Sequence, residues 1–158
     1  MTQGSSTADR PGVIARPPLI YAAALLVALL LRWIRPWPIL PPRLVPWIGL
    51  ALVALGLAIA IPGRLALKSA GTNVNPSKPT TAIVTRGPYR FTRNPLYIAL
   101  TCLYVGLTLA FDTGWGLVLL VPVLATMHFG VVLREERYLE GKFGEEYRQY
   151  RGRVRRYL

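Results

Sequence analysis

Cysteine, histidine and acidic residues are scarce in this sequence, and their scarcity narrows the chemistry that it can support. The chain has 158 residues, with one Cys, one His and seven Asp and Glu. Because Cys102 has no second thiol to pair with, neither an internal disulfide nor a thiolate metal cluster is available. Cys102 is best explained as a small buried hydrophobe, and we expect no metal centre.

Charge is also missing from long stretches of the chain. Residues 45–61, 96–111 and 115–133 contain no charged side chain, and residues 17–34 contain only Arg32. Each stretch is close to the ~17 to 25 residues that a membrane-spanning helix needs. The sequence therefore predicts an all-α, polytopic membrane protein with four transmembrane helices, at about residues 17–34, 45–62, 95–112 and 115–133. Four such runs in so short a chain disfavour the alternative of a soluble helical core.

The first apolar stretch resembles a signal peptide in its hydrophobicity, but its end does not. It leads into Arg32-Trp33-Ile34-Arg35, without the small residues of a cleavage site. We expect it to be retained as a helix.

Basic residues predict the orientation of these helices. All but three of the 19 Lys and Arg lie in the amino-terminal tail, the second loop and the carboxy-terminal tail; the exceptions are Arg32, Arg35 and Arg43. By the positive-inside rule, both termini are cytoplasmic, and we expect a bacterial cytoplasmic membrane. The four tryptophans agree, because Trp33, Trp37, Trp47 and Trp115 all fall at the predicted outer boundary.

The net charge of +12 indicates contact with anionic lipid and control of topology, and we expect no nucleic-acid partner. The sequence does not define an oligomeric state.

Outside the helices, the pattern predicts one domain over residues 17–158, preceded by a disordered cytoplasmic tail at 1–16. A cytoplasmic loop at 63–94 follows Pro62 and Gly63, and is long enough to suggest a function. The tail at 134–158 has aromatic residues at helical spacing, with possible breaks at Gly141, Gly144 and Gly152. It is either a basic helix on the membrane surface or a lid over the polar residues described next.

Two polar clusters flank the last two apolar stretches on the predicted cytoplasmic side. The first, residues 86–97, is rich in Arg and Tyr, and Asn94-Pro95 suits the start of a helix. Arg93 and Tyr97 are four residues apart, so they share a helical face if the helix begins early. The second cluster contains the acidic pair Glu135-Glu136. His128 lies seven residues before Glu135 and is either functional or a hydrogen-bonded packing residue.

These clusters and the chain end together resemble a known family. Gly87-Pro88-Tyr89-Arg90 is followed by Arg93-Asn94-Pro95-Leu96-Tyr97, then Glu135-Glu136-Arg137-Tyr138-Leu139, then Phe143-Gly144-Glu145-Glu146-Tyr147, with Tyr150 and a final Arg153-Val154-Arg155-Arg156. In this order, with an apolar helix pair between the first two segments, they resemble the isoprenylcysteine carboxyl methyltransferase and phospholipid methyltransferase superfamily over about residues 70–158. Asn94 stands where many members have histidine, and Arg155 where the family pattern has proline.

The resemblance implies an integral membrane methyltransferase that uses S-adenosylmethionine, with a lipophilic acceptor arriving from the bilayer. It implies cofactor-binding roles for the first cluster and the acidic pair: Gly87, Tyr89, Arg93, Asn94, Pro95, Tyr97, Glu135 and Glu136. The residue chemistry is compatible, because a sulfonium ion with an amino-acid tail needs carboxylates for its ammonium group, an Arg for its carboxylate and aromatic faces near its sulfur.

The acceptor is expected to be a hydrophobic or lipid-like molecule, with a carboxylate preferred and a thiol or amine left open. Glu135 and Glu136, with Arg134 and Arg156 to orient an acceptor carboxylate, are the candidate catalytic residues. The alternative function is a non-catalytic four-helix membrane binding or assembly module, or a small transporter. A transporter is disfavoured, because the predicted helix centres hold few polar residues and polar residues gather at one face.

Overall fold

The computed structural model describes residues 11–39, 41 and 44–157, and the regular elements in this part of the chain are all helical, without a β-strand. The all-α prediction is therefore confirmed. The elements are α1 (Pro17–Ile34), α2 (Val45–Ser69), the 3-10 turn η1 (Gly87–Arg90), α3 (Pro95–Ala110), α4 (Gly114–Met127), the π-helical turn η2 (His128–Val132), α5 (Leu133–Phe143) and α6 (Glu145–Arg153).

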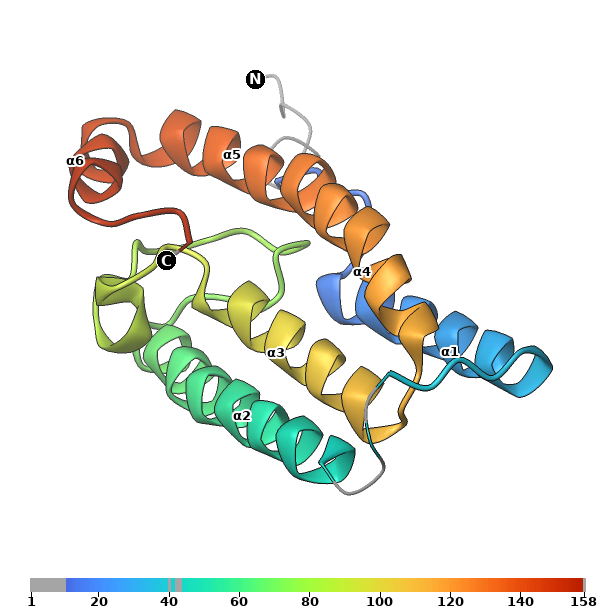
Figure 1. The fold of residues 1–158 in the computed structure, drawn as a ribbon. Helices are drawn as coiled ribbons and strands as arrows, with labels where there is room; N and C mark the ends of the chain where they lie inside the picture. Colours follow the sequence, from blue (N-terminus) through green and yellow to red (C-terminus); the bar gives the residue numbers. More distant parts are fainter. Residues whose placement is uncertain (1–10, 40, 42–43, 158) are drawn as a thin grey trace.

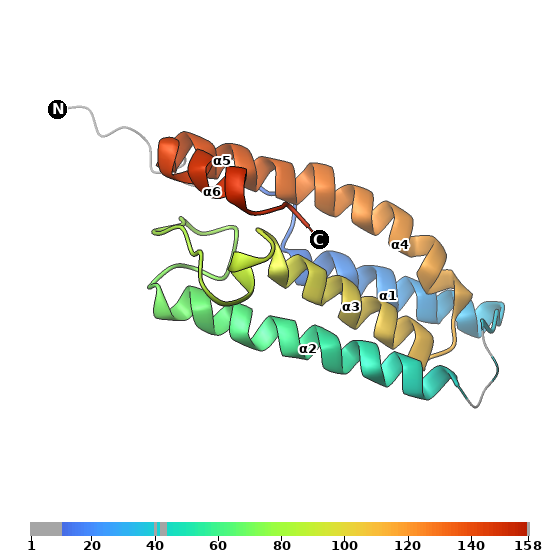
Figure 2. The same ribbon diagram turned by 60° about the vertical axis from the view of Figure 1, so that its left-hand side comes forward.

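Helices α1 to α4 run up and down beside one another (Figures 1 and 2), with α3 in contact with each of the other three. At one end, the segment after α1 meets the turn between α3 and α4: Gly114 N donates to Trp37 O at 2.8 Å, and Ile39 N donates to the Asp112 carboxylate at 2.8 Å. The segment after α1 and the turn after α3 therefore lie together. The loop after α2 and the carboxy-terminal helices gather at the opposite end.

Among the described residues, three helical segments are long and apolar enough to cross a membrane: Pro17–Ile34, Trp47–Ser69 and Gly114–Phe143. Helix α3 is apolar but shorter. Large hydrophobic side chains lie on the outside of the bundle, including Trp33 at 85% and Trp47 at 72% exposure. Exposed apolar surface of this extent is typical of contact with lipid. These features support a membrane protein.

Helix α2 is longer than the sequence pattern predicts, so the boundary expected at residue 62 is wrong. Pro62 lies inside the helix, which continues to Ser69, and the loop begins at residue 70 instead of 63. A proline removes one backbone hydrogen bond, but residues 64–68 are mostly strong helix formers. Tertiary contacts also support this last part: the Leu96 side chain lies over Gly63, and Gly87 lies over Ala66.

Glycines let α2 and α3 approach closely. A Cβ atom on Gly106 would lie 2.8 Å from Gly49 O, and one on Gly49 would lie 2.7 Å from Gly106 O. Backbone therefore packs on backbone here, as is common where membrane helices meet at small residues. This contact fixes the position of α3, and with it the site residues Arg93 and Asn94, just before the helix, and Tyr97, in its first turn.

The fourth predicted helix extends beyond its expected end, because α4, η2 and α5 form one continuous helical segment from Gly114 to Phe143. A single π turn inside a helix changes the direction in which the following side chains point. The chain then turns at Gly144, which has a positive φ of 53°, before α6 folds back. The expected break near this glycine is confirmed.

The amino-terminal tail is predicted to be disordered over residues 1–16. Residues 1–10 lie outside the described part of the chain. Residues 11–16 lie against the α4–α5 segment, where Ile14 N donates to Gly130 O at 3.3 Å and Arg134 donates to Gly12 O at 3.0 Å.

Candidate functional site

The first polar cluster folds into a compact turn ahead of α3. Residues 87–90 form η1, whose first residue, Gly87, has a positive φ of 59° that favours glycine. Pro95 occupies the first turn of α3, as expected. Asn94 stands at the cap position, but its side chain makes no cap hydrogen bond. It donates instead to the Arg156 carbonyl at 3.0 Å, so Asn94 connects α3 to the chain end.

Residues 154–157, which we call the C-terminal strap, lie along this turn. Arg93 N donates to Arg155 O at 2.9 Å, and Thr92 Oγ1 donates to Arg156 O at 3.0 Å. Thr92 and Arg155 also form an isolated parallel β-bridge. Arg155 takes part in this pairing through its backbone.

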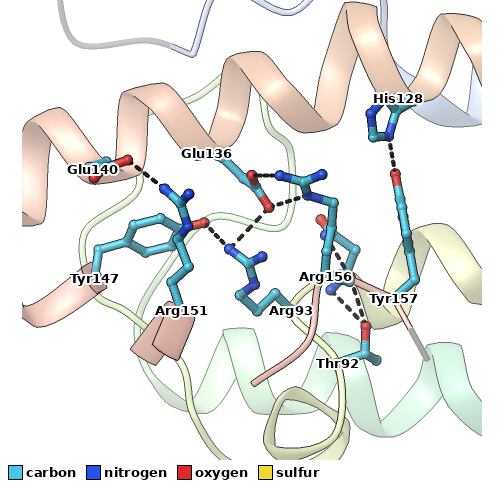
Figure 3. A network of polar contacts seen from close by, with 10 residues as sticks. Thr92, Arg93, His128, Glu136, Glu140, Tyr147, Arg151, Arg156 and Tyr157 are labelled. Atoms are coloured by element: carbon cyan, nitrogen blue, oxygen red, sulfur yellow. Dashed lines mark hydrogen bonds and ion pairs between the residues drawn. The ribbon is translucent and has the colours of Figure 1, made fainter. Parts of the chain in front are cut away.

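Glu136 lies at the centre of an ion-pair network that joins α5, α3 and the C-terminal strap (Figure 3). Arg156 binds it with two hydrogen bonds of 2.9 and 2.8 Å, and Arg93 Nη1 lies 3.1 Å from Glu136 Oε1. The side chains of Arg93 and Glu136 are 8% and 10% exposed. The hydrogen bond to Glu136 raises the pKa of Arg156. Both oxygens of Glu136 are thus engaged by arginines.

Glu135 points to a different place. Tyr97 OH donates to Glu135 Oε2 at 2.6 Å, and both residues line a cavity beside the network. Glu135 and Glu136 are adjacent in the chain, but their side chains point in different directions, because successive helical residues are about 100° apart. Glu135 is therefore the carboxylate that faces the cavity.

We call this space the polar cavity. It lies between the loop at residues 73–84, the first turn of α3, and helices α5 and α6. About 90 Å³ is free within it, which is room for a few water molecules, so a larger ligand requires the loop or α6 to move outward. Its polar and aromatic lining includes Tyr89, Arg93, Tyr97, Glu135, Tyr147 and Tyr150.

Besides Tyr97, the tyrosines Tyr89, Tyr147 and Tyr150 line the polar cavity. Tyr150 OH donates to Tyr89 O at 2.7 Å, and Arg93 donates to Tyr147 OH at 3.2 Å. Burial raises the pKa of Tyr89, Tyr147 and Tyr150, and the Glu136 carboxylate raises that of Tyr147 further. Tyr147 and Tyr150 are buried on α6, so this helix covers the cavity as a lid does.

A second hollow of about 480 Å³, the apolar cavity, lies between α1, α3 and α4 next to the polar cavity. Tyr97 lines both cavities. His128 and Tyr157 lie in the apolar cavity, with His128 Nδ1 and Tyr157 OH 2.9 Å apart. His128 and Glu135, seven residues apart, thus line two neighbouring cavities, and the π-helical turn η2, which begins at His128, shifts the helical phase before Glu135.

The structure brings most of the predicted site residues together, but not all. Arg93, Tyr89, Tyr97, Asn94 and Glu135 line the polar cavity, and Glu136 and Arg156 form the network beside it. Gly87 and Pro95 shape the turn. Arg134 lies apart, beside Gly12. The sequence reasoning missed Tyr147 and Tyr150 as lining residues, although their helical spacing in the tail was the available signal.

The residues of the polar cavity fit the groups of S-adenosylmethionine. Arg93 Nε is buried without a hydrogen-bond partner in the described ranges, although buried donors are normally satisfied. It is available to an anionic group. Glu135 offers a carboxylate to a cation, and the tyrosines offer aromatic faces.

Comparison with known proteins matches the chain to one family model. The family model described as "Phospholipid methyltransferase" matches residues 44–146, a range that contains both polar clusters. A curated "Uncharacterized protein" of Haemophilus influenzae is 33% identical over 63 residues, which is 40% of this chain and all of that protein. No solved structure matches the chain.

Proposed function

The chain belongs to the phospholipid methyltransferase family, and on that premise we propose that it transfers a methyl group from S-adenosylmethionine to a hydrophobic or lipid-like acceptor. Membership confirms the resemblance to the superfamily of isoprenylcysteine carboxyl and phospholipid methyltransferases, and it supports a membrane methyltransferase. The cofactor, the acceptor and the likeness to isoprenylcysteine carboxyl methyltransferases are parts of the proposal.

The observation that carries the proposal is that Glu135 and Arg93 line the same cavity. Bound there, S-adenosylmethionine supplies an electrophilic methyl group on a sulfonium sulfur. Glu135 would hold the ammonium group of its amino-acid part, and Arg93 Nε the carboxylate, each as a charge-assisted hydrogen bond. Tyr89 and Tyr97 would present aromatic faces to the positive sulfur.

Glu136 and Arg156 would act as positioning residues. Their hydrogen bonds tie the C-terminal strap to α5, and Glu136 holds Arg93 at the wall of the cavity. Asn94 fixes the strap from the side of α3. Holding reactants in line is the main contribution that a protein makes to such a displacement, on the order of 7 to 11 kcal/mol for well-oriented groups.

The acceptor would occupy the apolar cavity. This space touches the polar cavity at Tyr97, and its lining is mostly apolar, which suits a hydrocarbon chain. The carboxylate acceptor remains a prediction. Of the two arginines suggested to orient it, Arg156 is engaged by Glu136 and Arg134 lies beside Gly12.

The membrane topology is also part of the proposal. Helix α3 lies between three candidate spans and contacts all of them, which supports four crossings with α3 as a short one. The end that carries residues 70–94 and the C-terminal strap would face the cytoplasm, because most basic residues are there.

Titration calorimetry of the detergent-purified protein with S-adenosylmethionine and with S-adenosylhomocysteine tests the cofactor. We expect saturable binding of both, because they share the amino-acid and nucleoside parts. Adenosine, which lacks the amino-acid part, should bind at least tenfold more weakly. Absence of binding by a folded, monodisperse sample would refute the proposal.

A further inference from the structure

The apolar cavity contains no charged side chain among its described lining residues. Its polar groups are hydroxyls, one thiol and one imidazole: Tyr21, Tyr97, Thr101, Cys102, His128 and Tyr157. An ion placed there would lose its water without gaining a counterion, which is costly. The cavity therefore favours an acceptor that arrives neutral.

Most of these hydroxyl groups already donate their proton in a hydrogen bond within the protein. Thr101 Oγ1 donates to Tyr97 O at 2.9 Å, so Tyr21 OH is the donor in its 2.8 Å contact with Thr101. Tyr97 OH donates to Glu135 at 2.6 Å. The pair formed by His128 and Tyr157 is the one that retains a choice of donor and acceptor.

The neighbouring cations are engaged elsewhere. Arg93 and Arg156 both bind Glu136, at 3.1 Å and at 2.8 and 2.9 Å. Arg93 Nε, which is outside this network, would hold the cofactor carboxylate, so a carboxylate in the apolar cavity would have to take one arginine from the network. A neutral acceptor leaves the network intact.

A neutral acceptor with a weakly acidic proton needs a base, and His128 is placed to be one. It is the single histidine of the chain, lines the apolar cavity and has its Nδ1 2.9 Å from Tyr157 OH. With Nδ1–H donated to the Tyr157 oxygen, the second ring nitrogen, Nε2, has an unused lone pair. Tyr157 belongs to the C-terminal strap, so the same segment that binds Glu136 also orients the imidazole.

We propose that the acceptor is an apolar thiol bound in the apolar cavity, and that His128, oriented by Tyr157, takes its proton. This rests on the proposed function. A thiol is neutral near pH 7 and, with a pKa of about 8.5, is acidic enough to give its proton to an imidazole, whereas an alkyl amine arrives charged and an alcohol is far less acidic. The S–H bond of the thiol breaks and its proton moves to His128 Nε2. The thiol sulfur forms a bond to the methyl carbon, and the bond from that carbon to the sulfonium sulfur breaks with its electron pair left on that sulfur. The products are a methyl thioether and S-adenosylhomocysteine, and His128 then releases the proton to water.

Because the chain has one histidine, nuclear magnetic resonance of protein labelled with 15N-histidine reports on His128 alone. With S-adenosylhomocysteine present, 1-dodecanethiol should shift the ring resonances saturably. Dodecanoic acid at pH 7, the matched probe for a carboxylate acceptor, should bind at least tenfold more weakly. Stronger binding of dodecanoic acid, or no shift with either probe, would overturn the thiol assignment.

Methyl transfer provides the second readout. We expect label from S-[methyl-3H]adenosylmethionine to appear in methyl dodecyl sulfide, and His128→Ala to lose at least 100-fold in kcat. Added imidazole should restore part of that loss, which a merely structural histidine would not allow. Tyr157→Phe should retain more activity than His128→Ala, and Val121→Ala, on the exposed face of α4, should match the unaltered protein.

The outcomes separate the two proposals. If S-adenosylhomocysteine binds but dodecanoic acid is methylated and dodecanethiol is not, or if neither probe is methylated, the thiol inference fails and the proposed function stands. If imidazole gives no rescue, His128 is not the base. If S-adenosylhomocysteine does not bind at all, the proposed function itself fails.

Discussion

Glu136→Gln is expected to release the C-terminal strap and to lower stability by about 2 to 3 kcal/mol. Removing one partner of a buried ion pair typically costs about 3–5 kcal/mol, and the estimate is reduced because the Arg156 side chain is 33% exposed. The neutral amide leaves Arg93 buried without its carboxylate. We expect trypsin to cut at Arg153, Arg155 and Arg156 at least tenfold faster, as measured by mass spectrometry of native digests.

Glu140→Gln is the matched control for this result. It removes the partner of Arg151, but that pair is about half exposed on one side, and exposed pairs contribute about 0–1 kcal/mol. Its digestion should resemble that of the unaltered protein. Equal cleavage of both variants would mean that the strap is not held by Glu136.

Glu135→Gln is expected to weaken binding of S-adenosylmethionine by 10- to 100-fold while leaving the fold intact. Hydrogen bonds to charged groups contribute about 1.5–3 kcal/mol, and the amide oxygen can still accept from Tyr97 OH. Calorimetry gives the dissociation constant, and circular dichroism gives the helix content. Arg93→Ala is less informative, because it removes a partner of Glu136 as well as a cofactor ligand.

Glu146→Gln supplies the comparison for Glu135→Gln, since Glu146 is an exposed carboxylate on α6. It should bind the cofactor as tightly as the unaltered protein. If both variants bind with unchanged affinity, Glu135 does not hold the ammonium group.

The helices could be predicted from sequence because apolar length is a local property. Residues 17–34 form α1 with the expected ends, and Pro95 begins α3 as expected. The end of α2 could not be predicted in this way. Pro62 favours a break locally, while the contact of Leu96 with Gly63 that supports the longer helix depends on a distant segment.

The candidate site was predictable in composition but not in arrangement. The sequence places the clusters around Arg93 and Glu135 on the same side of the membrane, and in the fold both residues line the polar cavity. Glu135 faces the polar cavity and Glu136 binds the arginines. Which carboxylate does which depends on the helical phase after η2, and the spacing of residues in the sequence does not define that phase. The hydrogen bond from Arg93 N to Arg155 O joins two segments that are distant in the chain. No local sequence pattern indicates that they pair, so the position of the C-terminal strap could not be predicted from the sequence.

Hydrogen–deuterium exchange with and without S-adenosylhomocysteine tests the central claim most directly, because it reports both binding and its place. The account predicts slower exchange at residues 73–97 and 133–150, which surround the polar cavity, and unchanged exchange at residues 114–127. Protection confined to other segments, or no protection in a folded sample at saturating ligand, would contradict it.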